Sequence, residues 1–140
     1  MSWFWNAITK KYAAFSGRAR RREFWFYHLF YFLIFFVIVL VVAMITGVLQ
    51  GLAGQTTYDD QLGEALSGIW LLAFLIPSLA VAVRRLHDIG LSGWWMLIAF
   101  VPLLGNLTLT VMFLLDSQIG DNKYGPNPKE AASAVGPASP

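Results

Sequence analysis

The sequence predicts an all-α polytopic membrane protein with three transmembrane helices and a short amphipathic interfacial helix at its N-terminus. Apolar residues make up 57% of the 140 residues and charged residues only 13%, against roughly 25% charged in a typical soluble domain. The apolar residues also gather in three long runs, with the charges bunched between them. So few charges could not cover a water-facing surface, which indicates that lipid surrounds much of the chain.

The first predicted element is an amphipathic helix over residues 2–15. Trp5, Ile8, Tyr12 and Phe15 recur at helical spacing, while Lys10 falls on the opposite face. Aromatic rings on one face and lysine on the other suit the layer of lipid headgroups. We favour lipid contact for this helix, with packing against the rest of the protein as the alternative.

The three apolar runs cover residues 24–49, 66–83 and 94–115. At 1.5 Å per residue they would be ~39, ~27 and ~33 Å long as helices, and the hydrocarbon core of a bilayer is ~30 Å thick. We therefore expect one membrane domain over residues 1–128 with three spans. The Ala, Ser, Gly and Pro composition of residues 129–140 predicts a disordered tail.

β-Branched and aromatic residues dominate the middle of the first run, at positions 35–42, and would favour a strand in water. Helix is predicted nevertheless, because a segment surrounded by lipid must satisfy its own backbone hydrogen bonds. A β-barrel is disfavoured because its strands would alternate apolar and polar residues. Pro77, Pro102 and Gly105 can each kink a helix. We favour a single kinked third span, with a break near Gly105–Asn106 and re-entry as the alternative.

The distribution of basic residues predicts the orientation. Loops on the cytoplasmic side of a membrane protein are enriched in Lys and Arg. Six basic residues precede the first run, the loop over residues 50–65 has none, and Arg84 and Arg85 follow the second run. Three spans would then place the N-terminus in the cytoplasm and the tail, with Lys123 and Lys129, outside. Aromatic residues mark the expected interfaces, with Trp5, Trp25, Trp94 and Trp95 as anchors.

Three motifs are more specific than composition. They are an Arg-rich stretch at 15–25, Arg-Arg-Leu-His-Asp at 84–88 followed by Ser-Gly-Trp-Trp at 92–95, and Asn-Lys-Tyr-Gly-Pro-Asn-Pro at 122–128. In this order they resemble the small bacterial inner-membrane proteins of domain-of-unknown-function family 805 (DUF805), over nearly the whole chain. The resemblance implies a compact helical protein of the bacterial inner membrane. It implies no reaction.

Charged residues of the first two motifs form the candidate site, and the predicted topology places them at the cytoplasmic interface: Arg18, Arg20, Arg21, Arg22, Glu23, Arg84, Arg85, His87 and Asp88. The interpretation we favour is structural, with anchoring and ion pairs between helices; Asp88 could pair with Arg84, and Glu23 with Arg84 or Arg85. The second is recognition of anionic headgroups or a phosphate-bearing ligand. The third is catalysis or metal binding by His28, His87 and Asp88, for which no local ligand spacing exists.

We therefore expect a binding or accessory module that uses a cytoplasmic arginine patch, rather than an enzyme. One alternative is a small oligomeric transporter or channel subunit, although the spans carry few ionisable groups. Another is a membrane enzyme acting on a lipid-linked substrate through His87 and Asp88. The expected partners are the bilayer, including anionic lipid, and a second copy or another membrane protein. Nucleic acid, metal and cofactors are not expected, and the absence of cysteine rules out disulfides and Cys-based metal sites.

Overall fold

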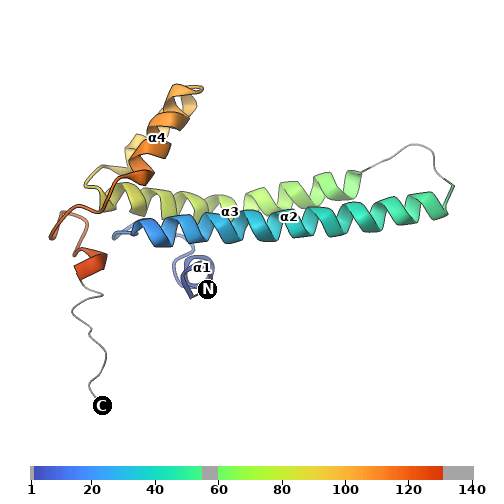
Figure 1. Ribbon diagram of the computed structural model, residues 1–140, viewed down its shortest axis with the longest axis horizontal. Coiled ribbons are helices and arrows are strands. Elements are labelled where there is room, and N and C mark those ends of the chain that lie inside the picture. The colour runs from blue at the N-terminus through green and yellow to red at the C-terminus, as the bar shows by residue number, and fades with distance from the viewer. Residues whose placement is uncertain (1, 55–59, 131–140) are drawn as a thin grey trace, which may run out of the picture.

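The structure, a computed structural model, describes residues 2–54 and 60–130. These residues form helices α1 (Ser2–Thr9), α2 (Arg21–Leu52), α3 (Gln61–Asp88), the 3₁₀ helix η1 (Gly93–Phe100) and α4 (Leu104–Leu114), with no strand among them. Figure 1 shows α2 and α3 side by side along the long axis, with α1 packed across them and α4 projecting from the same end of the pair. The prediction of an all-helical protein is confirmed.

Helices α2 and α3 are long and apolar enough to cross a membrane. Their most apolar windows have mean hydropathies of 3.2 and 2.2, yet only 6% and 22% of the residues in those windows are buried. A core helix of a soluble protein would bury its apolar side chains, whereas these helices expose Phe32, Phe36 and Leu72 by 60% or more. Such surfaces are stable only against lipid or another apolar partner.

Both long helices extend beyond the apolar runs that predicted them. The side chain of Asp60 caps α3 by accepting a hydrogen bond from the Gly63 backbone amide. At the other end α3 continues through Arg84 and Arg85 to Asp88. Gly90, with φ +82°, then reverses the chain, and the Leu91 amide donates to the Leu86 carbonyl. This is a glycine-terminated helix end, which satisfies carbonyls that would otherwise lack donors.

Pro77 lies inside α3 and cannot donate to the carbonyl of Ala73, four residues earlier. The hydroxyl of Tyr12 donates to that carbonyl at 2.6 Å. The segment after α1 therefore supplies from outside the hydrogen bond that the proline removes.

Helix α1 is shorter than predicted and packs on the protein. It ends at Thr9 rather than near residue 15, and its buried face consists of Phe4 and Ala7, which join a core with Tyr27 and Val81. Trp5 is 58% exposed on the opposite side. The alternative weighed above, packing against the rest of the protein, describes the Phe4 face.

The prediction of one kinked helix over residues 94–115 is wrong. The chain forms η1, turns at residues 101–103 and returns as α4. Pro102 disfavours helix at Val101, which is extended. Leu103 has φ +63° and ψ −62°, and the Leu104 amide donates to the Pro102 carbonyl at 2.7 Å, which together define a classic γ-turn. The alternative of a break in this segment, here at residues 101–103 rather than at Gly105–Asn106, describes the structure better.

Glycine at position 105 makes this helical hairpin possible. A β-carbon there would lie 1.7 Å from the Ile98 carbonyl oxygen, far closer than van der Waals contact permits. The two arms can approach only because this residue has no side chain. After α4 the chain arrives back at the end of the molecule where α2 begins and α3 ends.

This return also corrects the predicted position of the C-terminal segment. Residues 116–130 pack beside Arg18 and Asp88 instead of lying at the opposite end of the helix pair. Lys129 and Glu130, which the sequence assigned to a disordered tail, make hydrogen bonds to Asp116 and Asn127. The remainder of the predicted tail, residues 131–140, lies outside the described residues.

Candidate functional site

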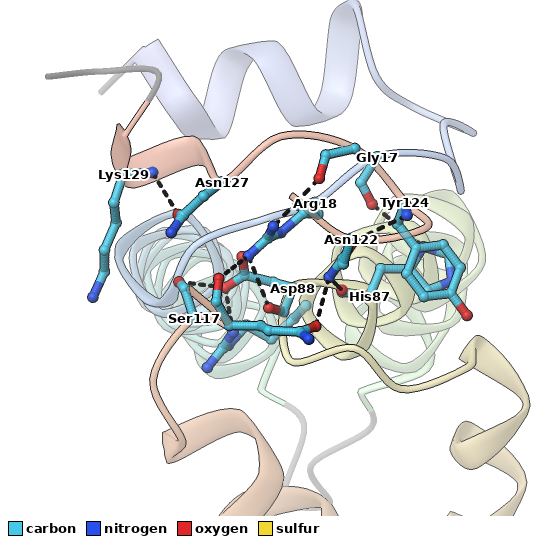
Figure 2. Close-up of polar contacts among 12 residues, drawn as sticks. Gly17, Arg18, His87, Asp88, Ser117, Asn122, Tyr124, Asn127 and Lys129 are labelled. Carbon is cyan, nitrogen blue, oxygen red and sulfur yellow. Dashed lines mark hydrogen bonds and ion pairs between the residues drawn. The ribbon is translucent and has the colours of Figure 1, made fainter. Parts of the chain in front are cut away.

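The three sequence motifs meet at one end of the molecule, around the carboxylate of Asp88. This side chain is fully buried at the last residue of α3. Its Oδ1 accepts from Nε of Arg18 at 3.1 Å, and its Oδ2 accepts from Nη1 of Arg85 and Oγ of Ser117, each at 2.6 Å. Figure 2 shows Arg18, Asp88 and Ser117 converging from separate segments. We call Arg18, Arg85, Asp88 and Ser117 the Asp88 cluster.

Arg18 connects the cluster to the segment that follows α4. Its Nη2 donates to the carbonyls of Gln118, at 2.6 Å, and Asp88, at 3.2 Å, and its Nη1 donates to those of Gly120, at 2.7 Å, and Gly125, at 3.3 Å. Its exposed fraction is 7%. Because loop carbonyls have no helical partner, a planar guanidinium with five donors satisfies several of them at once.

Arg85 performs the same task for the end of α4. Its Nε donates to the carbonyl of Phe113 at 3.3 Å, and its Nη2 donates to that of Leu115. The last four carbonyls of a helix lack intrahelical donors, and a cation at this end also interacts favourably with the helix dipole. Arg85 therefore fixes the returning arm of the hairpin to α3.

Arg84 points to a different partner. Its Nη1 lies 2.6 Å from Oε1 of Glu23, in the first turn of α2, and Asp88 pairs with Arg85 rather than with Arg84. Glu23 therefore pairs with Arg84, one of the two arginines that the sequence suggested as its partner. The Nε and Nη2 atoms of Arg84 are buried with no hydrogen-bond partner in the described part of the chain. The Arg84 backbone carbonyl also accepts from the Ala19 amide at 2.9 Å, which joins the segment before α2 to α3.

The third motif, residues 122–128, packs over His87 at the end of α3. The ring of Tyr124 stacks on that of His87 with centroids 3.7 Å apart and planes 5° apart. The side-chain amide of Asn122 donates to the His87 backbone carbonyl at 2.9 Å. Nδ1 of His87 lies 3.3 Å from the Gly17 carbonyl oxygen. The buried side chain of Asn127 holds the Lys129 amide, as Figure 2 shows. Sequence reasoning assigned Ser117, Asn122 and Tyr124 no role in the site, although the motif at 122–128 marked this segment.

The candidate arginines therefore form two groups. The inner arginines, Arg18, Arg84 and Arg85, are buried and paired with Glu23 or Asp88. The outer arginines, Arg20, Arg21 and Arg22, are exposed or half-buried at the start of α2. With Lys129 the outer arginines line a pocket of about 430 Å³. Lys129 also pairs with exposed Asp116, and its hydrogen bond lowers the pKa of that carboxyl group.

This arrangement argues against a catalytic or metal-binding role for the pair His87 and Asp88. Both carboxylate oxygens of Asp88 already accept charged or hydroxyl donors, and His87 is covered by Tyr124. His28 lies two turns into α2, away from the cluster. Within residues 2–54 and 60–130, no three His, Asp or Glu side chains gather as a metal site would require.

Comparison with known proteins shows where the chain belongs. The family model described as protein of unknown function, DUF805, matches residues 12–126. The inner membrane protein YhaI of Escherichia coli K12 is 41% identical over 130 residues, which is 92% of this chain and 97% of the relative. The inner membrane protein YhaH of the same organism is 33% identical over 92% of this chain and 98% of its own length. No solved structure matches the chain.

Proposed function

The chain belongs to the DUF805 family of proteins of unknown function, and we propose that it is a binding or accessory module of the inner membrane whose outer arginines hold phosphate-bearing headgroups. The resemblance expected from the three motifs is confirmed by the family match. The chain is an integral membrane protein, because its relatives are inner membrane proteins and two of its helices expose apolar surfaces of sufficient length. The arginine patch and its ligand are our proposal.

The proposed topology has two spans, α2 and α3, and a re-entrant hairpin formed by η1 and α4. The N-terminus and residues 116–130 then share the cytoplasmic side, and the loop between α2 and α3 faces outward. The hydrogen bonds from Arg18 to Gln118 and Gly120 support this topology because they join segments before and after the hairpin. All ten Lys and Arg residues of the sequence would lie on one side, in agreement with the positive-inside rule.

Reporter fusions test this topology. A reporter that is active only in the cytoplasm is expected to be active when fused after Glu130, and inactive when inserted after Gly54. A periplasmic reporter should give the reverse pattern. Periplasmic activity after Glu130 would mean that the hairpin crosses the membrane, and would restore the three-span topology predicted from the apolar runs.

The separation of the arginines into two groups is the observation that carries the ligand proposal. The inner arginines are occupied by carboxylates and carbonyls. Arg21 and Arg22, in contrast, have no ion pair within the described ranges and line the basic pocket together with Arg20 and Lys129. The same two arginines begin an apolar groove along α2, lined by Trp25, Phe26 and Leu29. Cations above an apolar groove match the chemistry of an anionic phospholipid.

The experiment compares lipids retained by purified protein in mild detergent, counted by native mass spectrometry. Phosphatidylglycerol should be retained in preference to phosphatidylcholine. Each juxtamembrane arginine contributes about 1 kcal/mol to binding an anionic membrane surface, so R21Q combined with R22Q should weaken retention roughly tenfold to thirtyfold.

The matched control is K10Q combined with K11Q, which removes two exposed positive charges that do not line the pocket. This control should retain phosphatidylglycerol. Inorganic phosphate is added in a second arm. If it displaces the lipid at millimolar concentration, a soluble phosphate compound becomes the better ligand. Equal retention of both lipids by the unmodified protein would refute the proposal.

A further inference from the structure

A second site lies between the hairpin and the long helices, at a distance from the outer arginines. The cleft there has a volume of about 320 Å³ and is lined by residues of α2, α3, η1 and α4. Four of its lining side chains are polar but uncharged, and they come from three helices: His28 of α2, Ser78 of α3, and Asn106 and Thr110 of α4. We call this space the hairpin cleft. None of its lining residues is Lys, Arg, Asp or Glu.

The hairpin cleft lies within the apolar part of the protein. His28 follows Arg21 by seven residues, which is ~10 Å along a helix. The rings of Phe24 and Phe113, whose centroids are 4.4 Å apart, line the cleft, and the Phe113 carbonyl accepts from Arg85 of the Asp88 cluster. The hairpin turn carries Phe100 and Leu103, 85% and 79% exposed. A molecule that reaches the cleft therefore approaches through apolar surroundings.

His28 offers a hydrogen-bond acceptor in this cleft. Its Nδ1 lies 3.0 Å from the Phe24 carbonyl oxygen, and a carbonyl can only accept. Nδ1 must therefore carry the proton, and in the neutral imidazole this leaves Nε2 as an acceptor. Within the part of the chain that the structure describes, no hydrogen bond reaches Nε2.

Asn106 offers both a donor and an acceptor. It lies in the first turn of α4, and its backbone carbonyl accepts from the Thr110 hydroxyl at 2.8 Å. No hydrogen bond to its side-chain amide is formed by any described residue. An amide without partners costs several kcal/mol in an environment that cannot hydrogen-bond. Asn106 is exposed, and in the proposed re-entrant hairpin it faces lipid, so its side chain is expected to have a partner from outside the chain.

We propose that the hairpin cleft binds the head of a neutral lipid alcohol, such as a diacylglycerol. A hydroxyl group is both a donor and an acceptor, so a lipid alcohol offers a donor for Nε2 of His28 and an acceptor for the Asn106 amide, two lining groups without a hydrogen-bond partner among the described residues. A ketone or ester would offer only acceptors and leave His28 unpaired. An anionic head would be buried without a counter-charge, because the lining has none. The apolar chains would leave along the exposed surface of the hairpin.

The proposal goes beyond the headgroup site at the outer arginines and does not depend on it, but it rests on the proposed re-entrant hairpin. Its test therefore uses unmodified outer arginines and nanodiscs of phosphatidylcholine, which carries no net charge. A diacylglycerol labelled for detection is titrated into the nanodiscs, and its methyl ether serves as the matched ligand that cannot donate. We expect saturable binding of about one diacylglycerol per chain. The ether should bind about five- to tenfold more weakly, the effect of one hydrogen bond.

Two variants locate the site, and a third serves as their control. H28F and N106L keep the approximate side-chain volume, and each should reduce diacylglycerol affinity about five- to tenfold. T108V removes a hydroxyl from the same helix, but Thr108 does not line the cleft, so its affinity should match the unmodified protein. If the first two variants fail to fold, the comparison between alcohol and ether in the unmodified protein still decides the question.

Three results would overturn the proposal. The first is diacylglycerol binding that does not saturate, and the second is equal binding of the alcohol and its ether. The third is a dimer of this chain that dissociates in N106L, because a second copy would then be the partner of the cleft. Binding that saturates near one per chain and weakens in both variants, but not in T108V, would support it.

Discussion

Arg18, one of the inner arginines, is only two to four residues from the outer arginines in sequence and lies at the same end of the molecule, yet its surroundings differ from theirs. Arg18 is 7% exposed and donates to Asp88 and to loop carbonyls, while Arg22, four residues later, is exposed. The inner group satisfies the ends of α3 and α4, and the outer group lines an open basic pocket. An arginine-rich motif can therefore combine two roles, one in holding the fold and one in presenting charge.

The largest effect is expected from Asp88, which keeps two inner arginines neutralised. D88N leaves Arg18 and Arg85 buried without a carboxylate, and breaking a buried ion pair costs about 3–5 kcal/mol. Thermal unfolding in detergent should show a strongly lowered midpoint or no folded protein. D121N, which neutralises an exposed aspartate in the segment after α4, is the control and should leave the midpoint unchanged. A stable D88N protein would remove the distinction between the two groups of arginines.

The hairpin of η1 and α4 brings the carbonyls at the end of α4 to Arg85. Forcing its two arms apart should therefore remove hydrogen bonds of the inner arginines and leave the outer arginines unchanged. In G105A the new methyl group meets the Ile98 carbonyl, and such overpacking typically costs about 1–3 kcal/mol. The Gly47 position has open space around it, so G47A should be neutral or slightly stabilising. Unfolding midpoints of the two variants provide the comparison. If G105A were as stable as G47A, the arms of the hairpin would not be in contact.

Tyr12, like the inner arginines, donates a hydrogen bond to a helix carbonyl that has no donor within its own helix. That carbonyl belongs to Ala73, four residues before Pro77. Y12F removes the donor to the Ala73 carbonyl and should cost about 1 kcal/mol. P77A restores a backbone amide to that carbonyl, so Y12F should cost much less when P77A is present. A double-mutant cycle of unfolding free energies measures this coupling. Additive effects would show that the hydroxyl does not compensate for the proline.

The outer arginines should contribute least to stability. Because Arg21 and Arg22 have no carboxylate partner within the described residues, R21Q combined with R22Q is expected to change the unfolding free energy by less than about 0.5 kcal/mol, the usual range for surface substitutions. The same protein preparation should show the loss of phosphatidylglycerol described above. A large loss of stability in this variant would place these arginines with the inner group.

Asp116 offers the smallest and most local test. Its exposed carboxylate accepts a hydrogen bond from Lys129, which lowers its pKa. A lowered folded-state pKa stabilises the folded protein above the unfolded pKa, and this contribution disappears as the pH falls through the folded value. In K129Q the Asp116 pKa should rise toward its usual value, as measured by NMR titration in detergent micelles. An unchanged Asp116 pKa in K129Q would mean that Lys129 does not stabilise the Asp116 carboxylate.

Several features of the site could not be predicted from the sequence and are visible only in the folded chain. The third apolar run looked long enough to span, but Pro102, the γ-turn at Leu103 and the contact between Gly105 and Ile98 fold it back. Composition cannot reveal this, since a kinked span and a hairpin have the same hydropathy. The return brings Gln118 and Gly120 to Arg18, about one hundred residues away in sequence. No local pattern could therefore separate Arg18 from Arg20.

Residue order and composition were enough to predict a helical membrane protein, a concentration of basic residues near one end of it, and the family to which the chain belongs. Those properties follow from the length and polarity of continuous segments. A segment crosses a bilayer only if it is long and apolar enough, and basic residues favour the cytoplasmic side. Only the folded chain shows which arginines are buried, where residues 116–130 lie and that a cleft with four polar side chains forms beside the hairpin. These outcomes depend on pairings between distant residues, and such pairings arise only when the turn at Leu103 reverses the chain.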